Sequence, residues 1–208
     1  MNICQKIKTD IIKNQLPRGK PLRQVTLSSR YGVSRIPIRD ALLSLKAEGW
    51  LVPHGKAGVM IPALDWKEAE DLYLMRSYLE GLIFNMAFEH ICPEDLLKAR
   101  GFLMELDKEG VGLLERGKLN WSFHKALYQA ANRPTLLQVI AGLNEQVVRY
   151  MGFQYGPLDY RHRSEYQHEI LLNHIENKDK ISAECLLKLH IEEAGVLLVD
   201  YLKSSEAR

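Results

Sequence analysis

Three histidines in the second half of the chain have the side chains and surroundings of a metal site. His124, His168 and His190 each lie among Leu, Ile or Phe residues in segments with helical periodicity, so each is expected to face inward. Neutral imidazole binds Zn, Ni, Cu and Fe, and the cores of helical bundles often hold such ions. Asn120 shares a helix face with His124, but its neutral amide is a poor ligand compared with a carboxylate. The alternative is that each histidine is a core residue with a satisfied hydrogen bond.

A second candidate site is a helix-turn-helix near the N-terminus. Residues 27–31 form a short helical piece, and Gly32 follows at the position of a sharp turn. Ser34 is a suitable N-cap for the next helix, and Pro37 falls in its first turn, where a missing N–H costs little. This order is the plan of a DNA-binding helix-turn-helix, whose second helix enters the major groove.

The second helix of this motif has a basic face and an apolar face. Arg35 and Arg39 are four residues apart and share one side, whereas Ile38, Leu42 and Leu45 recur at helical spacing on another. The arginines are therefore candidates for contacts with DNA. The alternative is an ordinary helical hairpin with surface arginines.

Charge divides the 208-residue chain into two parts. Residues 1–62 hold eleven Lys/Arg against three Asp/Glu, whereas residues 63–208 hold seventeen against twenty-three. A basic domain joined to an acidic one indicates that only the first meets a polyanion. The sequence shows no signal-peptide pattern, no apolar run of membrane-spanning length and three widely spaced cysteines, so we expect a cytoplasmic protein.

A β-hairpin is expected directly after the second helix of the motif. The apolar stretches 51–52 and 59–61 would be its strands, with a turn at 53–56. A hairpin in this place is a wing, whose tip at His54, Gly55 and Lys56 can lie against phosphate. The alternative is that the hairpin only covers the core of the domain.

The remaining sequence is helical throughout. Helices are expected near 66–90, 93–109, 114–131, 134–153, 160–176 and 179–203. Long helices joined by short loops favour an antiparallel bundle. The predicted fold is therefore mainly α, with a winged helix-turn-helix in residues 1–62 and an all-α bundle in residues 63–208.

The N-terminal region resembles the GntR family of transcription regulators, in its FadR-like branch. The family's "PG..L" segment is similar to LPRGKPL, and its "lgVSRtPVReAL..L..eGl" signature is similar to YGVSRIPIRDALLSLKAEGWL. HGKAGVMI resembles the wing. The resemblance implies that the protein binds a double-stranded DNA operator. The expected DNA-binding residues are Ser34, Arg35, Pro37, Arg39, His54, Gly55 and Lys56.

The rest of the chain resembles the FCD-type effector domain of that family. Three segments carry the likeness, namely MRSYLEGLIFNMA, NWSFHKALYQAANRPTLLQVI and YQHEILLNHIENKDKISAECLLKLHI. The family's Asp and three His ligands fall on Asn120, His124, His168 and His190. A divalent transition metal such as Zn or Ni is therefore expected, at a site weakened by the neutral Asn120.

The function implied by this resemblance is a homodimeric regulator whose operator binding responds to a small carboxylate. The carboxylate would bind the metal, or pair with Arg76 or Arg149, although each arginine could equally form an ordinary salt bridge. We expect neither an enzyme nor a membrane protein. The first alternative is a helical metalloenzyme that activates water. The second is a regulator whose helical domain only dimerises.

Overall fold

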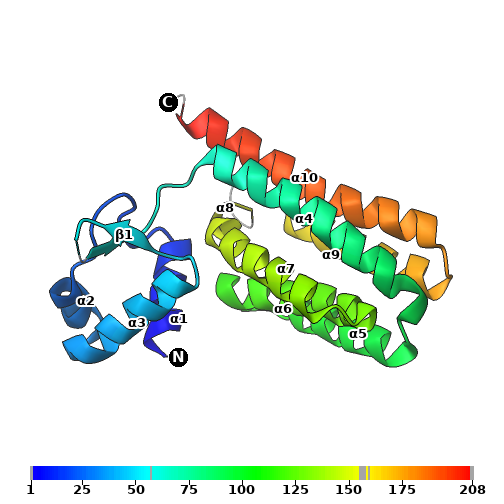
Figure 1. Ribbon diagram of the computed structural model, residues 1–208, viewed down its shortest axis with the longest axis horizontal. Coiled ribbons are helices and arrows are strands. Elements are labelled where there is room, and N and C mark those ends of the chain that lie inside the picture. Colours follow the sequence, from blue (N-terminus) through cyan, green and yellow to red (C-terminus); the bar gives the residue numbers. More distant parts are fainter. Residues whose placement is uncertain (1, 57, 155–157, 159, 207–208) are drawn as a thin grey trace.

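The computed structural model describes residues 2–56, 58–154, 158 and 160–206. A small N-terminal part, residues 2–62, which we call the winged module, lies beside one end of a larger helical bundle (Figure 1). The winged module contains α1 (Ile3–Ile12), α2 (Gln24–Tyr31), α3 (Arg35–Ala47), β1 (Val52–His54) and β2 (Gly58–Met60). The bundle contains α4 (Trp66–Ala87), η1 (Phe88–His90), α5 (Pro93–Asp107), α6 (Leu113–Tyr128), η2 (Gln129–Ala131), α7 (Pro134–Val147), η3 (Val148–Tyr150), α8 (Met151–Gln154), α9 (Arg161–Glu176) and α10 (Lys180–Glu206).

The helix-turn-helix expected from the sequence is confirmed. Helix α2 ends at Gly32, whose φ of 65° lies in the left-handed region that glycine adopts without strain. Ser34 has extended backbone and is the N-cap of α3, although its side chain makes no capping hydrogen bond. Pro37 lies in the first turn of α3, where no intrahelical N–H partner is lost.

Helix α3 turns its apolar face inward and its basic face outward, as its periodicity predicts. Ile38, Leu42 and Leu45 are buried in the core of the winged module. Arg35 and Arg39 are exposed, and the guanidinium of Arg39 contacts only the neighbouring carboxylate of Asp40 among the hydrogen bonds described, at 3.2 Å. Both arginines are therefore free to reach a partner outside the chain.

The wing is present, but its strand limits differ from the expected ones. β1 and β2 pair antiparallel, with Pro53 opposite Val59 and His54 opposite Gly58. The turn therefore begins later than expected, because Pro53 and His54 of the expected turn 53–56 lie in β1. Proline is tolerated at the edge of a sheet and need not mark a turn. The returning strand ends at Met60, and Ile61 instead forms a parallel bridge with Arg18.

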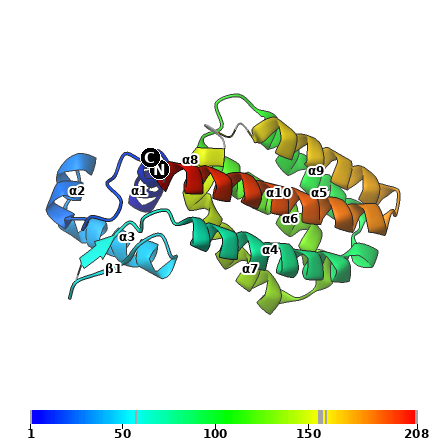
Figure 2. The same cartoon turned by 90° about the horizontal axis from the view of Figure 1, so that it is seen from above.

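Each of the six helices expected in the bundle has an α-helical counterpart, but their ends differ from the expected ones. Helix α4 begins after Asp65, whose Oδ1 accepts a hydrogen bond from the N–H of Lys67 at 2.8 Å. The helix expected at 134–153 is broken into α7, η3 and α8. Helix α4 packs between α10 and α7, and Figure 2 shows α4 and α10 running side by side. Within the described residues, no helix is both long and apolar enough for a membrane span.

The winged module and the bundle share a continuous apolar contact. Leu114, Val148 and Met151 of the bundle belong to the same buried cluster as the core of the winged module. Gly152 lies so close to the carbonyl oxygen of Ile12 that a Cβ there would collide with it. The apolar part of the bundle surface that meets the winged module is therefore built from α6, η3 and α8.

Polar contacts reinforce this junction around one carboxylate. Glu145 of α7 accepts a hydrogen bond from the indole N–H of Trp50 at 2.6 Å and pairs with the ammonium of Lys8. Lys8 also pairs with Glu48 at 2.6 Å and lies over the Trp50 ring. The fully buried Trp50 directly follows α3 and its C-terminal turn, so α7 contacts the segment at the C-terminal end of α3.

Candidate metal and effector site

The three histidines singled out in the sequence meet inside the bundle. His124 comes from α6, His168 from α9 and His190 from α10, and all three are buried. One ligand atom from each lies within 4.8 Å of the others. The Nε2 atoms of His168 and His190 are 3.2 Å apart, a separation that one ion can bridge, since Zn–N bonds are about 2.0–2.1 Å long.

The hydrogen bond that Nδ1 of His190 makes leaves the other ring nitrogen, Nε2, free to act as a ligand. Its Nδ1 lies 2.9 Å from Oε1 of Gln167, an atom that only accepts hydrogen bonds, so Nδ1 carries the proton. The amide of Gln167 is fixed in this orientation because its Nε2 donates to Glu193 at 2.9 Å. The lone pair of His190 Nε2 therefore points into the cluster.

A hydrogen bond at Nδ1 also fixes the tautomer of His124. The hydroxyl of Tyr128 donates to Oε2 of Glu80 at 2.8 Å, so its oxygen is left to accept from Nδ1 of His124 at 3.3 Å. Nε2 of His124 then carries a lone pair, and it is buried without a hydrogen-bond partner. Such outer-shell contacts are what hold metal-binding imidazoles in one tautomer.

Burial keeps the three imidazoles neutral. It lowers the pKa of His124 and of His168 well below the ordinary value, with a further lowering from neighbouring histidines. Burial, aided by the charge of Arg76, lowers the pKa of His190 to about 3. Neutral imidazole is the form that binds a metal ion.

Asn120 completes a set of donors that suits a cation. It lies one turn before His124 on α6, and its Oδ1 is buried without a partner. Of the four buried side-chain polar atoms that lack a partner in the described part of the chain, three are Oδ1 of Asn120, Nε2 of His124 and Nδ1 of His168, whose other ring nitrogen faces His190. Unpaired buried polar atoms are costly, so their concentration at one point fits a bound ion.

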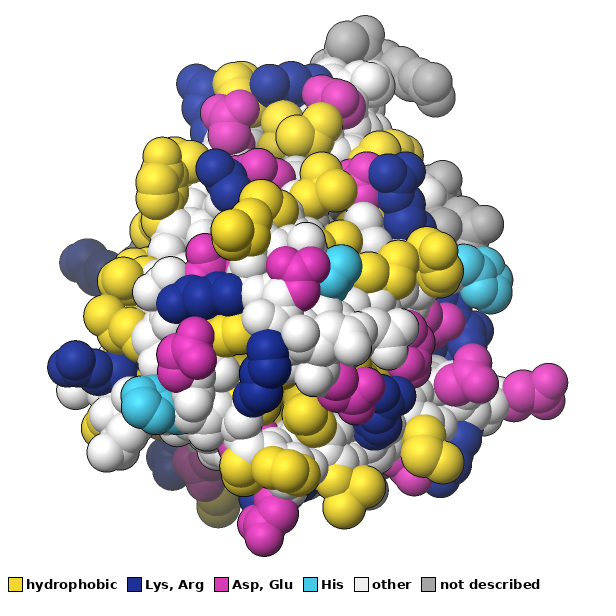
Figure 3. Space-filling model, turned by 90° about the vertical axis from the view of Figure 1, so that its right-hand side faces the viewer, with side chains coloured by type: hydrophobic (Ala, Val, Ile, Leu, Met, Phe, Trp, Pro, Cys, Tyr) yellow, Lys and Arg dark blue, Asp and Glu magenta, His cyan; other side chains and the backbone are white. Residues whose placement is uncertain are grey.

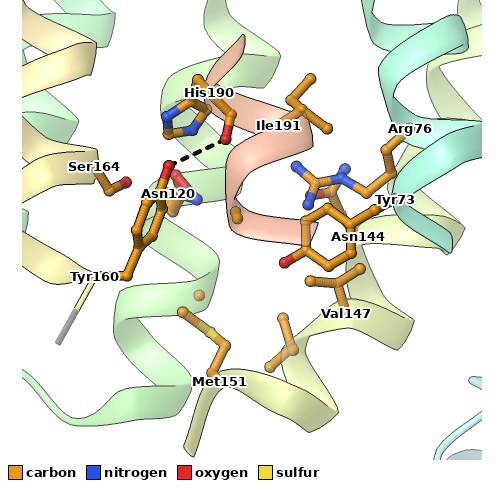
Figure 4. A pocket seen from close by; sticks show the side chains of 13 residues that line it. Tyr73, Arg76, Asn120, Asn144, Val147, Met151, Tyr160, Ser164, His190 and Ile191 are labelled. Atoms are coloured by element: carbon orange, nitrogen blue, oxygen red, sulfur yellow. Dashed lines mark hydrogen bonds between the residues drawn. The ribbon is translucent and has the colours of Figure 1, made fainter. Parts of the chain in front are cut away.

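A small cavity of about 40 Å³ adjoins the cluster. Arg76 lies on one side of it, and Asn120 and His190 lie on the other (Figure 4). Arg76 is buried, and its Nε donates to Oε1 of Glu80 at 2.6 Å. The other lining residues are Tyr73, Gly117, Asn144, Val147, Val148, Met151, Tyr160, Ser164, Ile191 and Ala194. The cavity thus combines a guanidinium with a candidate metal site.

Arg149, the second arginine considered for the effector, lies elsewhere. It is buried on η3, where its guanidinium binds Glu68 at 2.7 Å and the carbonyl oxygen of Gln146 at 3.2 Å. It is not among the residues that line the cavity. The structure therefore brings Arg76, but not Arg149, to the three histidines.

Several polar residues of the site were not foreseen. Glu80 and Tyr128 each follow a predicted site residue by four positions, so helical spacing alone offered a signal for them. Gln167 and Tyr160 gave no such signal, because they reach His190 only through the packing of α9 against α10.

The candidate DNA-binding residues form a separate, exposed surface on the winged module. Ser34, Arg35, Pro37 and Arg39 are exposed along the first half of α3. His54, Gly55 and Lys56 are exposed at the end of β1 and in the turn that follows, where Gly55 has a φ of 61°.

We predict that the buried histidines make the metal-free protein sensitive to acid. Their pKa values are lowered on folding, so below about pH 6.5 the unfolded chain binds more protons than the folded one, and the free energy of unfolding falls as the pH falls. Urea unfolding in chelator should show this fall between about pH 6.5 and pH 5. In the His190→Asn variant the fall should be smaller by up to about 1.4 kcal/mol per pH unit. The exposed His54→Asn variant serves as control, and equal slopes in all three proteins would contradict the prediction.

Comparison with known proteins identifies both parts of the chain. Residues 1–61 match the family described as bacterial regulatory proteins, gntR family, and residues 71–193 match the FCD domain. The Nta operon transcriptional regulator of Aminobacter aminovorans is 26% identical over 178 residues, 84% of this chain and 82% of the relative. The regulator McbR of Escherichia coli is 26% identical over 212 residues, 97% of this chain and 95% of the relative.

Solved structures agree with these matches. A GntR-family regulator from Pseudomonas syringae is 30% identical with a TM-score of 0.61, over 99% of this chain and 86% of that one. E. coli McbR/YncC shares the fold with a TM-score of 0.72 at 22% identity, over 96% of both chains. The exposed basic helix, the wing and the helical bundle therefore have one explanation: the chain belongs to the GntR family of bacterial transcriptional regulators and carries an FCD domain.

Proposed function

We propose that this regulator binds its operator through residues 1–62 and senses a small carboxylate through residues 63–208. The observation that carries the proposal is the pairing of an exposed basic helix with a small cavity that is lined by Arg76 and His190 and adjoins the cluster of three neutral histidines. The protein would act in the cytoplasm, where it meets bacterial DNA.

Charge supports the assignment of DNA binding to the winged module. At the end of the bundle that faces away from this module, Lys and Arg side chains are mixed with Asp and Glu (Figure 3). Residues 1–62, by contrast, hold eleven Lys/Arg and three Asp/Glu. A polyanion is therefore attracted to the winged module, where Arg35 and Arg39 would read bases or hold phosphates and Lys56 would contact the backbone.

The histidine cluster would hold a divalent transition metal such as Zn or Ni. His124 and His190 would bind it through Nε2, with His168 as the third imidazole and Asn120 Oδ1 as a weaker neutral donor. When bound, the ion would supply a positive charge and an open position for an anionic ligand. Arg76 would pair with the same ligand from the other side of the cavity.

The cavity wall offers a physical link between effector and operator. Val148 and Met151 line the cavity and also pack into the core of the winged module. Asn144 lines the cavity, and the next residue on α7, Glu145, holds Trp50. The cavity has room for about three water-sized groups, so a larger ligand must displace this wall. Binding would then favour one placement of the winged module over another.

A second copy of the chain would pack on α4, giving a homodimer that reads two half-sites. Leu74, Tyr78, Leu82 and Met86 follow one another at four-residue intervals and are all exposed. A continuous apolar stripe of this kind is typical of an interface. Sedimentation should show a dimer that Tyr78→Glu dissociates, whereas a monomeric wild-type protein would contradict this arrangement.

We predict that Arg35→Ala and Arg39→Ala each weaken operator binding by about 5- to 150-fold, the loss expected for one arginine–guanine contact. The operator would first be selected from random duplex DNA, and affinity would be measured by fluorescence anisotropy at fixed salt. Circular dichroism should be unchanged, because both side chains are exposed. Lys188→Ala removes one positive charge from α10 and is the matched control. Wild-type affinity in both arginine variants would refute their role.

We also predict that the wild-type protein retains about one divalent ion per chain after dialysis against Zn²⁺ and that His124→Ala does not. Metal content would be measured by mass spectrometry. His162→Ala, which removes an exposed histidine of α9, should keep the ion. The proposed metal site would be refuted if the wild-type protein contained no zinc, or if wild type and His124→Ala had equal zinc contents.

A further inference from the structure

The donors that this chain offers to a cation carry no charge. Burial keeps His124, His168 and His190 neutral, and Asn120 offers an amide oxygen. None of the described residues that line the adjoining cavity is Asp or Glu. A divalent ion held here would therefore keep its full charge in the interior.

Two carboxylates reach the histidines through one intervening side chain, and both are already engaged. Glu193 reaches His190 through Gln167 and pairs with Arg163. Glu80 is fully buried, and its two oxygens accept hydrogen bonds from Arg76, Asn144 and Tyr128. It reaches His124 only through the hydroxyl of Tyr128. Glu80 thus balances Arg76 and Glu193 balances Arg163, so neither of these carboxylates is left to neutralise the ion.

An uncompensated buried charge is costly, and an anion that shares the cavity removes this cost. We propose that the cavity takes a divalent cation and a small carboxylate as a linked pair, each increasing the affinity for the other, because Asn120 is neutral. This inference rests on the metal and effector site proposed above and adds the dependence between its two ligands. Linkage makes the effect reciprocal, so the ion strengthens carboxylate binding by the same factor.

The size of the cavity limits the carboxylate. A volume of about 40 Å³ accommodates about three water-sized groups, so acetate, with its four non-hydrogen atoms, is close to this size but must press against the shared wall. Acetate is therefore a suitable probe. Acetamide has nearly the same shape but no charge, so it separates charge from fit.

The test measures zinc affinity of the full-length protein by calorimetry, with free Zn²⁺ buffered by a chelator. We expect saturating acetate to lower the Kd for zinc at least tenfold, and acetamide to leave it within about twofold. Zinc should in turn lower the Kd for acetate by the same factor. Equal zinc affinity with and without acetate would overturn the linkage while leaving the metal site intact, whereas no zinc binding under any condition would refute the proposed site itself.

Two variants locate the effect at position 120. Asn120→Asp supplies the missing negative charge, so it should bind zinc at least tenfold more tightly without acetate and lose most of the acetate effect. Asn173→Asp adds the same charge at an exposed position of α9 and should behave as wild type. Asn120→Ala stays neutral and should keep the acetate effect on weaker zinc binding. An acetate effect in Asn120→Asp as large as in wild type would contradict the proposal, and if that variant does not fold, the acetate and acetamide titrations of the wild type decide it.

Discussion

One buried ion pair holds both halves of the candidate site. Arg76 and Glu80 are one turn apart on α4, with 5% and 0% of their surfaces exposed. Loss of either partner would leave a buried charge uncompensated, at a cost of about 3–5 kcal/mol. The second oxygen of Glu80 binds Tyr128, which orients His124. The guanidinium that faces the cavity and the imidazole that faces the cluster are therefore positioned by the same carboxylate.

The cavity and the winged module share a wall, so a ligand in the cavity would press on residues that also pack against the winged module. Val148 and Met151 contact both, and α7 presents Asn144 to one side and Glu145 to the other. Packed walls of this kind shift between discrete arrangements rather than deforming smoothly. A ligand regulates only through a difference in its affinity for two such arrangements.

The elements of the fold were largely predictable, because strong periodicity and punctuation mark them. Ile38, Leu42 and Leu45 set the face of α3, and Asp65 marks the start of α4. The three histidines also met as expected. Residues that act through tertiary packing were not predictable: Arg149 faces Glu68 and lies outside the cavity lining, and Gln167 reaches His190 across two helices. The wing limits differ from the expected ones because proline is typical of turns, whereas Pro53 lies in a strand.

The central claim is that a ligand in the helical bundle changes how tightly the winged module holds DNA. It is tested most directly by the operator affinity of the zinc-loaded wild-type protein, measured at fixed salt with and without saturating acetate. We expect acetate to change the operator affinity by about 5- to 150-fold, and this change should disappear when zinc is removed or acetamide replaces acetate. An operator affinity that is the same under all of these conditions would contradict it.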